Sequence, residues 1–205
     1  MLDSEKRTRS AVAEGAHPSI LNSVRQADCD AAIWQRRLPS ELNSWLASLQ
    51  LGALRSARLC ARWPTIEKVA AELCRECSMP EGRDRSLFIS DIAHLSQLFM
   101  DASCTNTVNL RLDVVSGNAC HKFHQDYVTA RLLCTYRGAG TQYGYPRKDG
   151  IPDHVHQMSE GHVGLFRGRL WGSPNNVPLL HRSPPISGTG ERRLLLVIDP
   201  QDTDE

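Results

Sequence analysis

Three residues of this chain could together hold a metal ion. His124 and Asp126 are separated only by Gln125, and His181 lies much further along the chain. Two imidazoles and one carboxylate on one side of a divalent ion form the facial set of mononuclear Fe(II) sites, which leaves the opposite side open. On an extended strand, residues i and i+2 point the same way, so His124 and Asp126 could reach one ion. The sequence therefore predicts a metal site, provided that the fold returns His181 to the side of His124.

An arginine pair, Arg192 and Arg193, stands at the head of the apolar run 194–198. Strand alternation sends the two side chains to opposite faces, so only one can point toward the predicted site. A guanidinium group binds a carboxylate through two parallel hydrogen bonds, which suits an acidic co-substrate. The pair is equally compatible with a charged strand edge that keeps a sheet soluble.

Other histidines compete for a metal with the first set. His121 could support or replace a ligand, but residues i and i+3 face opposite sides of a strand, which argues against joint ligation with His124. His154 and His156 lie in the glycine-rich and proline-rich segment 138–161. We interpret them as loop histidines, and we expect the segment to form a mobile lid over the open face of the metal.

The seven cysteines show no framework spacing, as expected where thiols stay reduced. Cys74 and Cys77 form a CxxC pair, but no second pair of ligands lies nearby to complete a zinc site. Apolar residues recur around them at helical spacing. We therefore predict that both thiols lie in the core, on the buried side of an amphipathic helix.

Length and charge set limits on the function. The chain has 205 residues, 24 Lys and Arg, 23 Asp and Glu, and a formal net charge of +1. This balance gives no overall field that would attract nucleic acid, and we expect none as a partner. No apolar run approaches the roughly 20 residues of a membrane span, and none resembles a signal peptide. We expect a cytoplasmic protein without a membrane partner.

The first half of the chain has the pattern of helices. Residues 1–28 are polar and weakly periodic, which predicts a flexible N-terminal arm. A single domain is expected over 29–205, with a helical part over 29–103. Helices are predicted from Ser40 to Gly52, after Thr65, and over 87–100.

The second half changes to strands. Leu110, Leu112 and Val114 alternate with polar residues, as in a half-buried strand. An extended run over 119–124 and further strands over 131–136, 162–166, 177–181 and 192–198 are predicted. Helices followed by short strands indicate an α+β domain whose β part, 104–200, is antiparallel and sandwich-like or barrel-like.

The order of HxD, a distal histidine and a later arginine resembles that of the 2-oxoglutarate and Fe(II) dependent dioxygenases, over about 107–199. The resemblance implies N-terminal helices packed on a double-stranded β-helix, the jelly-roll or cupin-like barrel. It implies a facial triad of His124, Asp126 and His181, with Arg193 binding 2-oxoglutarate. Many of these enzymes carry Ser or Thr two residues after this arginine, where this chain has Leu195.

Two residues of the strand over 131–136 could compensate for that departure. Arg131 could supply a second cation, and Tyr136 or its neighbour Thr135 could donate a hydroxyl group to the co-substrate. We therefore include Arg131 and Tyr136 among the candidate cofactor-binding residues.

A closer resemblance covers more of the chain. The blocks 120–126, 131–136, 181–186 and 188–190 are similar to those of an uncharacterised bacterial family, domain of unknown function 1826. This family supplies no activity, so the functional expectation rests on the site residues. The leading hypothesis is an Fe(II) and 2-oxoglutarate dependent oxygenase of the hydroxylase type, with an unknown substrate. The alternative is a non-catalytic or cupin-like barrel that binds zinc or another divalent metal.

Overall fold

The computed structural model describes residues 11–147, 150–171 and 178–201. Its α-helices are α1 (Ser40–Ser48), α2 (Ile66–Glu76) and α3 (Arg83–Ser103), and its 3-10 helices are η1 (Pro18–Arg25), η2 (Leu51–Ala53) and η3 (Arg169–Trp171). The strands are β1 (Ala11–Gly15), β2 (Cys29–Trp34), β3 (Ala57–Arg62), β4 (Thr107–Val115), β5 (Ala130–Arg137), β6 (Gln142–Gly144), β7 (His156–Gln157), β8 (Val163–Arg167), β9 (Leu180–Arg182) and β10 (Arg193–Pro200).

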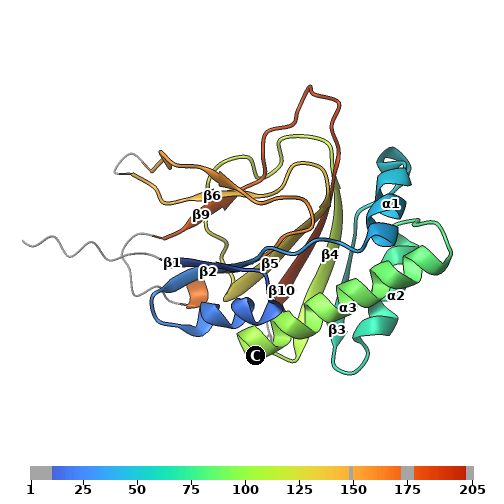
Figure 1. The fold of residues 1–205 in the computed structure, drawn as a ribbon, viewed down its shortest axis with the longest axis horizontal. Helices are drawn as coiled ribbons and strands as arrows, with labels where there is room; N and C mark the ends of the chain where they lie inside the picture. The colour runs from blue at the N-terminus through green and yellow to red at the C-terminus, as the bar shows by residue number, and fades with distance from the viewer. Residues whose placement is uncertain (1–10, 148–149, 172–177, 202–205) are drawn as a thin grey trace, which may run out of the picture.

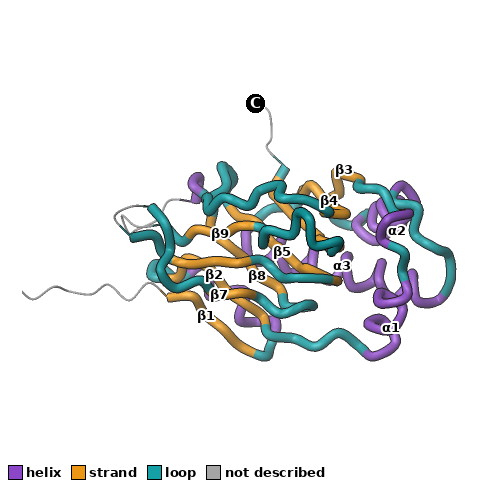
Figure 2. Tube along the Cα trace, turned by 90° about the horizontal axis from the view of Figure 1, so that it is seen from above, coloured by secondary structure: helices purple, strands orange, loops and turns teal. Residues whose placement is uncertain are grey.

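The strands form two sheets that face each other (Figures 1 and 2). The major sheet has seven strands in the order β1-β2-β8-β5-β10-β4-β3, and the minor sheet has three in the order β7-β6-β9. All pairings are antiparallel except that of β1 with β2. Two facing antiparallel sheets with long crossovers are the jelly-roll arrangement. The α+β prediction is confirmed, although the sheets do not close into a complete barrel.

The two faces of the major sheet bury different cores. Along β10, Leu194 and Leu196 pack on the side of the helices, whereas Leu195 and Val197 pack on the side of the minor sheet. This alternation follows from the period of two in a strand. Arg193 precedes Leu195 by two residues, so its side chain faces the minor sheet.

The helices cover only one face of the major sheet, and α3 runs along it in Figure 1. Phe88, Ile92, Leu95 and Phe99 recur at helical spacing on α3 and are all fully buried against that face. The other face is left to the minor sheet and to the residues between the two sheets.

The prediction of a flexible arm over residues 1–28 differs from the structure. Residues 11–15 form strand β1 at the edge of the major sheet, and η1 buries Leu21 and Val24 in the helix-side core. The sequence did not predict this order because the segment is mostly polar, and only two side chains of η1 are fully buried in the core. Residues 1–10 lie outside the described part of the chain.

The predicted helical part, 29–103, contains the three expected helices, but β2 and β3 also lie there and pair in the major sheet. Strand β2 is buried on both faces and therefore shows no alternation. Strand β3 alternates between half-buried and exposed residues over most of its length, but it is short and lies at the sheet edge. The sequence prediction missed both strands.

Two other predictions concern the loops and the cysteines. The expected lid, 138–161, contains β6 and β7, and Tyr143 within it is buried between the sheets, so much of this segment is part of the fold. Cys74 and Cys77 are 0% and 1% exposed in the helix-side core, which confirms that they are core residues.

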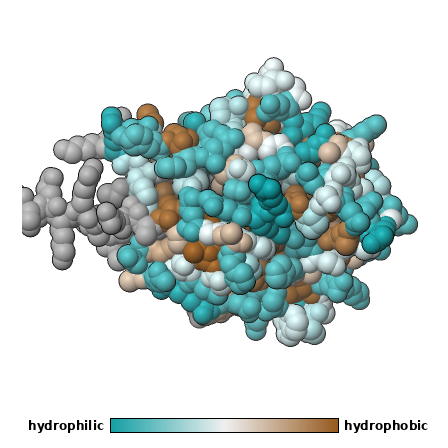
Figure 3. Space-filling view, in the orientation of Figure 1, coloured by the Kyte–Doolittle hydropathy of each residue, from teal (hydrophilic) through white to brown (hydrophobic). Residues whose placement is uncertain are grey.

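The surface of the molecule contrasts with its two buried cores. The face drawn in Figure 3 is mostly hydrophilic, with hydrophobic residues in separate groups. No helix among the described residues is both long and apolar enough to cross a membrane.

Candidate metal centre

The two candidate histidine ligands lie opposite each other on neighbouring backbone segments. His124 belongs to no regular strand, but it forms an isolated antiparallel bridge with His181 of β9. The N–H of His124 donates to the carbonyl of His181 at 3.0 Å, and the reverse hydrogen bond is 2.9 Å long. The imidazole rings consequently lie 4.8 Å apart, centroid to centroid.

The carboxylate of Asp126 lies between the two rings. The Nε2 atom of His181 is 2.9 Å from Oδ2 of Asp126, and Nε2 of His124 is 3.5 Å from Oδ1. Among the described residues, these three side chains form the one group of three or more His, Cys, Asp or Glu whose ligand atoms lie close enough for a shared ion, within 4.8 Å of one another. The structure thus brings together the three residues expected to bind the metal.

The backbone that positions His124 and Asp126 is not the strand expected over 119–124. Residues 119–129 form an irregular connection between β4 and β5, and only His124 makes a bridge. The backbone after Asp126 is held from the other side, because the N–H groups of Gly168, Arg169 and Leu170 donate to Thr129, Asp126 and Val128 respectively. A Cβ atom on Gly168 would lie 1.9 Å from the carbonyl oxygen of Val128. Glycine at this position is therefore required for the contact that fixes the Asp126 segment.

Both histidines are prepared to offer Nε2 to a metal. The Nδ1 atom of His124 lies 2.8 Å from the carbonyl oxygen of Lys122, which can only accept, so Nδ1 carries a proton and Nε2 is the nitrogen with a lone pair in the neutral ring. His181 is 5% exposed and packs against the ring of Phe166. Burial lowers the pKa of His181, which favours the neutral ligand form.

The geometry of Asp126 fits a cation. Its Oδ2 atom is buried and, although His181 Nε2 is near, has no hydrogen-bond partner in the structure. Ligand atoms at about 2.1 Å from one metal and at right angles lie about 3 Å apart, close to the observed 2.9 Å. A divalent ion would satisfy this buried oxygen and both imidazole nitrogens, and the N,N,O set leaves further coordination positions free.

Arg131 holds the other oxygen of the carboxylate. Its Nη1 donates to Oδ1 of Asp126, while Nε and Nη2 bind the two oxygens of Asp199 at 2.6 and 2.8 Å. Burial would raise the pKa of Asp126, but His124, His181 and Arg131 together outweigh it and hold that pKa well below its usual range. The guanidinium group of Arg131 therefore binds two carboxylates, and its side chain also lines the pocket beside His124 and His181.

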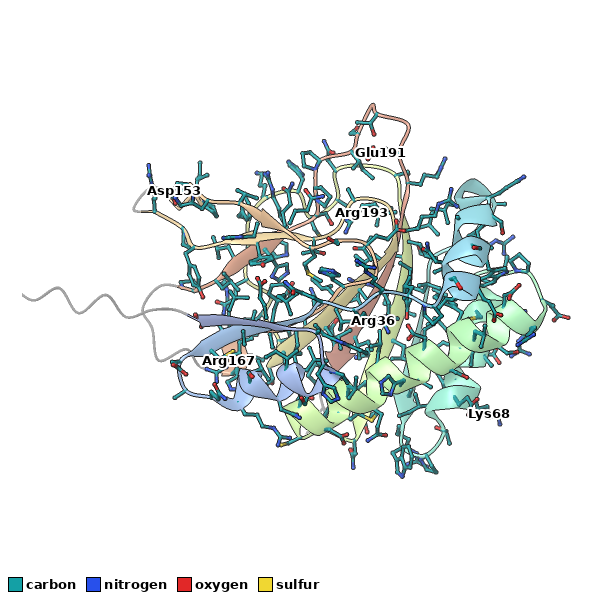
Figure 4. All side chains as sticks on the ribbon, in the orientation of Figure 1. Arg36, Lys68, Asp153, Arg167, Glu191 and Arg193 are labelled. Atoms are coloured by element: carbon teal, nitrogen blue, oxygen red, sulfur yellow. The ribbon has the colours of Figure 1, made fainter. Side chains whose placement is uncertain are left out.

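Arg193 is buried without a carboxylate. It is 0% exposed, and its donors bind only neutral oxygens: Nε binds the carbonyl of Ala139, Nη1 binds Ser183 Oγ at 2.9 Å, and Nη2 binds Thr135 Oγ1 at 3.1 Å. Burial lowers the pKa of Arg193 to about 10, and no acidic group offsets this. Figure 4 shows Arg193 at the start of β10, on the side of the minor sheet.

Its neighbour Arg192 is exposed and lies beside Gly52, away from the space between the sheets. Of the two arginines, Arg193 is therefore the one on the same sheet face as the metal candidates.

Tyr136 lies on the opposite face of the major sheet from the metal candidates. It is fully buried in the helix-side core, and its hydroxyl group donates to Asp91 of α3 at 2.6 Å. Asp91 is also bound by both terminal nitrogens of Arg36, which Figure 4 shows between the sheet and α3. Tyr136 therefore cannot reach a co-substrate at the metal, and its expected cofactor role is wrong. Thr135, one residue earlier, is the hydroxyl that reaches Arg193.

The remaining histidine candidates lie apart from the cluster. His121 is exposed and its Nδ1 contacts the carbonyl of Asn118. His156 stacks on Tyr143, and His154 is exposed. Within the described residues, none of the three joins the His124 group, so the site has three protein ligands there.

The sequence analysis missed Gly168, Ser183 and Asp199. Gly168 directly follows strand β8, and as a glycine it offered only a weak signal. The contact between Asp199 and Arg131 joins residues that only the pairing of β5 with β10 brings together.

Two solved structures that share this fold are dioxygenases for auxin oxidation. A dioxygenase for auxin oxidation from rice aligns with 94% of this chain and 84% of its own, with a TM-score of 0.57 and 12% identity. The dioxygenase for auxin oxidation 1 from Arabidopsis thaliana, solved with 2-oxoglutarate, aligns over 95% of both chains, with a TM-score of 0.53 and 12% identity. At this identity, the similarity establishes a shared fold.

Sequence comparison gives the family. Residues 15–199 match the family described as protein of unknown function (DUF1826), and the chain belongs to this family. No curated protein matches the sequence.

Proposed function

We propose that this protein is an Fe(II) and 2-oxoglutarate dependent oxygenase. The observation that carries the proposal is the buried guanidinium group of Arg193, which has only neutral partners and lies on the same sheet face as the His124, Asp126 and His181 cluster. A buried charge without a counterion is costly, and a co-substrate carboxylate would supply that counterion. The dioxygenase fold of the similar structures agrees with this assignment.

His124, Asp126 and His181 would hold the iron, and Arg193 would bind the distal carboxylate of 2-oxoglutarate. Bound iron and 2-oxoglutarate would supply oxidation of a substrate C–H bond by dioxygen, with conversion of 2-oxoglutarate to succinate and carbon dioxide. Ser183 and Thr135 accept hydrogen bonds from Arg193, so they orient its guanidinium group. They take the place of the Ser or Thr that Leu195 replaces.

The other residues of the site keep its geometry. Arg131, which is held by Asp199, donates to Oδ1 of Asp126 and leaves Oδ2 for the metal. Phe166 covers His181 and limits access of water from that side.

Anaerobic titration tests the proposal. Metal-free protein should bind one Fe(II), and later addition of 2-oxoglutarate should produce the weak visible charge-transfer band of the chelated co-substrate. Asp126→Ala should abolish the band. If the wild-type protein binds Fe(II) or zinc but never produces the band with 2-oxoglutarate, the oxygenase assignment fails and a metal-binding barrel without this co-substrate replaces it.

A further inference from the structure

A pocket beside the metal cluster opens between two rims that both carry arginine. Its lining includes both histidine ligands, Arg111 from β4 of the major sheet, and Arg182 from β9 of the minor sheet. A ligand that enters between the sheets would therefore meet a guanidinium group on each side.

The rim of the major sheet carries a second arginine. Arg58 of β3 is the direct cross-strand partner of Arg111, so their side chains lie next to each other on one face. Like charges in directly opposite positions destabilise a pair of strands, and an anion between them would reverse that effect. Arg58 is exposed and forms no ion pair with any residue that the structure describes.

The acidic residues near the pocket are already engaged. Asp199 binds Arg131 through both oxygens, and Asp126 belongs to the metal cluster. Asp113 forms an ion pair with Arg111, with 2.8 Å between Oδ2 and Nε, so it is engaged as well. Arg58 adds a charge that none of these acids balances.

The opposite rim is held in place. Nε of Arg182 donates to Gln142 Oε1 at 2.8 Å, and its guanidinium carbon lies 4.3 Å from the centre of the Phe123 ring. Among the described residues, Arg182 has no acidic partner. A fixed guanidinium group without a counterion is suited to bind an anion, since little entropy is lost on binding.

We propose that the substrate of this site carries an anionic group, a phosphate or a carboxylate, that is bound by Arg58, Arg111 and Arg182 at the mouth of the pocket. This inference rests on the proposed function, because it assumes that a substrate reaches the metal through the mouth of this pocket. A charged sheet edge would explain Arg58 alone. Arg182 also lies on an edge strand, β9 of the minor sheet, but contacts with Gln142 and Phe123 hold its guanidinium group in the lining of the pocket, which solubility alone does not require.

The test uses protein loaded with Fe(II) and 2-oxoglutarate without oxygen, titrated calorimetrically with phenyl phosphate and, separately, with benzoate. Saturating 2-oxoglutarate keeps both probes away from Arg193. At least one probe should bind saturably. Binding of phenyl phosphate would indicate a phosphate group on the substrate, and binding of benzoate would indicate a carboxylate. The double variant Arg58→Gln with Arg182→Gln should weaken that binding at least tenfold. Arg58→Gln alone, at an exposed position, should weaken it by a smaller factor.

The matched control is Arg83→Gln, because Arg83 is an exposed arginine on α3, on the other side of the major sheet. It should bind the probe as the wild type does. The inference is overturned if neither probe binds, if the double variant binds as tightly as the wild type, or if Arg83→Gln weakens binding equally.

The same titration separates this inference from the proposed function. If the wild-type protein shows no 2-oxoglutarate band, the titration is repeated with zinc-loaded protein. Probe binding that still depends on Arg58 and Arg182 would then support the anion site while the oxygenase assignment fails. If the wild-type protein shows a normal 2-oxoglutarate band but binds neither probe, the oxygenase assignment stands and the anion site is refuted.

Discussion

His124 and His181 are reciprocal backbone partners, each donating its N–H group to the carbonyl of the other. This backbone bridge sets the spacing between their imidazoles. Ligands that are held by the backbone need little reorganisation on metal binding.

Replacement of Asp126 by Ala should remove most of the bound metal without unfolding the domain. The reason is that Oδ2 of Asp126 is the buried, unsatisfied atom between the two imidazoles. Metal content by mass spectrometry and circular dichroism would measure both effects. Asp153→Ala is the control, since Asp153 pairs with Arg147 outside the cluster. Wild-type metal retention by the Asp126 variant would contradict the assignment.

Replacement of Arg193 by Ala should weaken 2-oxoglutarate binding at least tenfold while the metal stays bound. Loss of a buried charge-assisted pair costs about 2–5 kcal/mol. The matched control is Arg192→Ala, because Arg192 is exposed and lies beside Gly52. The dissociation constant would be measured from the charge-transfer band. A larger effect at residue 192 than at 193 would show that the wrong arginine is assigned.

Replacement of Gly168 by Ala should lower both stability and metal affinity. The new Cβ would meet the Val128 carbonyl at 1.9 Å, so the backbone contacts around Asp126 must shift. We expect a loss of about 1–3 kcal/mol of unfolding free energy, as for other overpacked positions. Urea unfolding and metal titration would measure it. Gly117→Ala, where a Cβ meets nothing within 4 Å, should change neither quantity; equal effects of the two substitutions would refute this role of Gly168.

Replacement of Asp91 by Ala should destabilise the fold by about 3–5 kcal/mol, since it leaves the buried charge of Arg36 without its partner. Tyr136→Phe, which removes one hydrogen bond to Asp91, should cost only about 1 kcal/mol. Both changes lie on the helix side of the sheet, so 2-oxoglutarate affinity should stay the same in Tyr136→Phe. A tenfold loss of 2-oxoglutarate affinity in Tyr136→Phe would instead show that Tyr136 contributes to co-substrate binding.

Thiol labelling should distinguish buried from exposed cysteines. Burial raises the pKa of Cys74 to about 12 and that of Cys77 to about 11, so almost no thiolate is present at pH 8. Iodoacetamide should label the exposed Cys60, Cys104 and Cys120 first. Peptide mass spectrometry would follow the rates, with urea-unfolded protein as the control. Early labelling of Cys74 in folded protein would contradict its burial.

The sequence predicted the metal candidates by residue type and order, although the local reason was wrong. His124 and Asp126 were placed on one strand, whereas a bridge to β9 and the contacts of Gly168 position them. Those contacts join segments far apart in the chain, and no local pattern carries them.

The error at Tyr136 could have been avoided from strand parity. Arg131 and Tyr136 differ by an odd number of positions on β5, so they cannot share a face of a regular strand. Arg131 lines the pocket beside the metal candidates, but its contact with Asp199 depends on the pairing of β5 with β10 and could not be predicted. The helices α1, α2 and α3 were predicted because their apolar spacing is local.

The isolated charge of Arg193 also affects the folding equilibrium. A guanidinium group that leaves water for three neutral oxygens raises the free energy of the native state, and a dicarboxylate that binds there lowers it again. By mass action, the stabilisation grows as the logarithm of the ratio of free ligand to its dissociation constant, about 2.7 kcal/mol at a hundredfold excess. If 2-oxoglutarate is that dicarboxylate, the melting temperature of the protein should rise with its concentration, so the proposed co-substrate would also stabilise the fold.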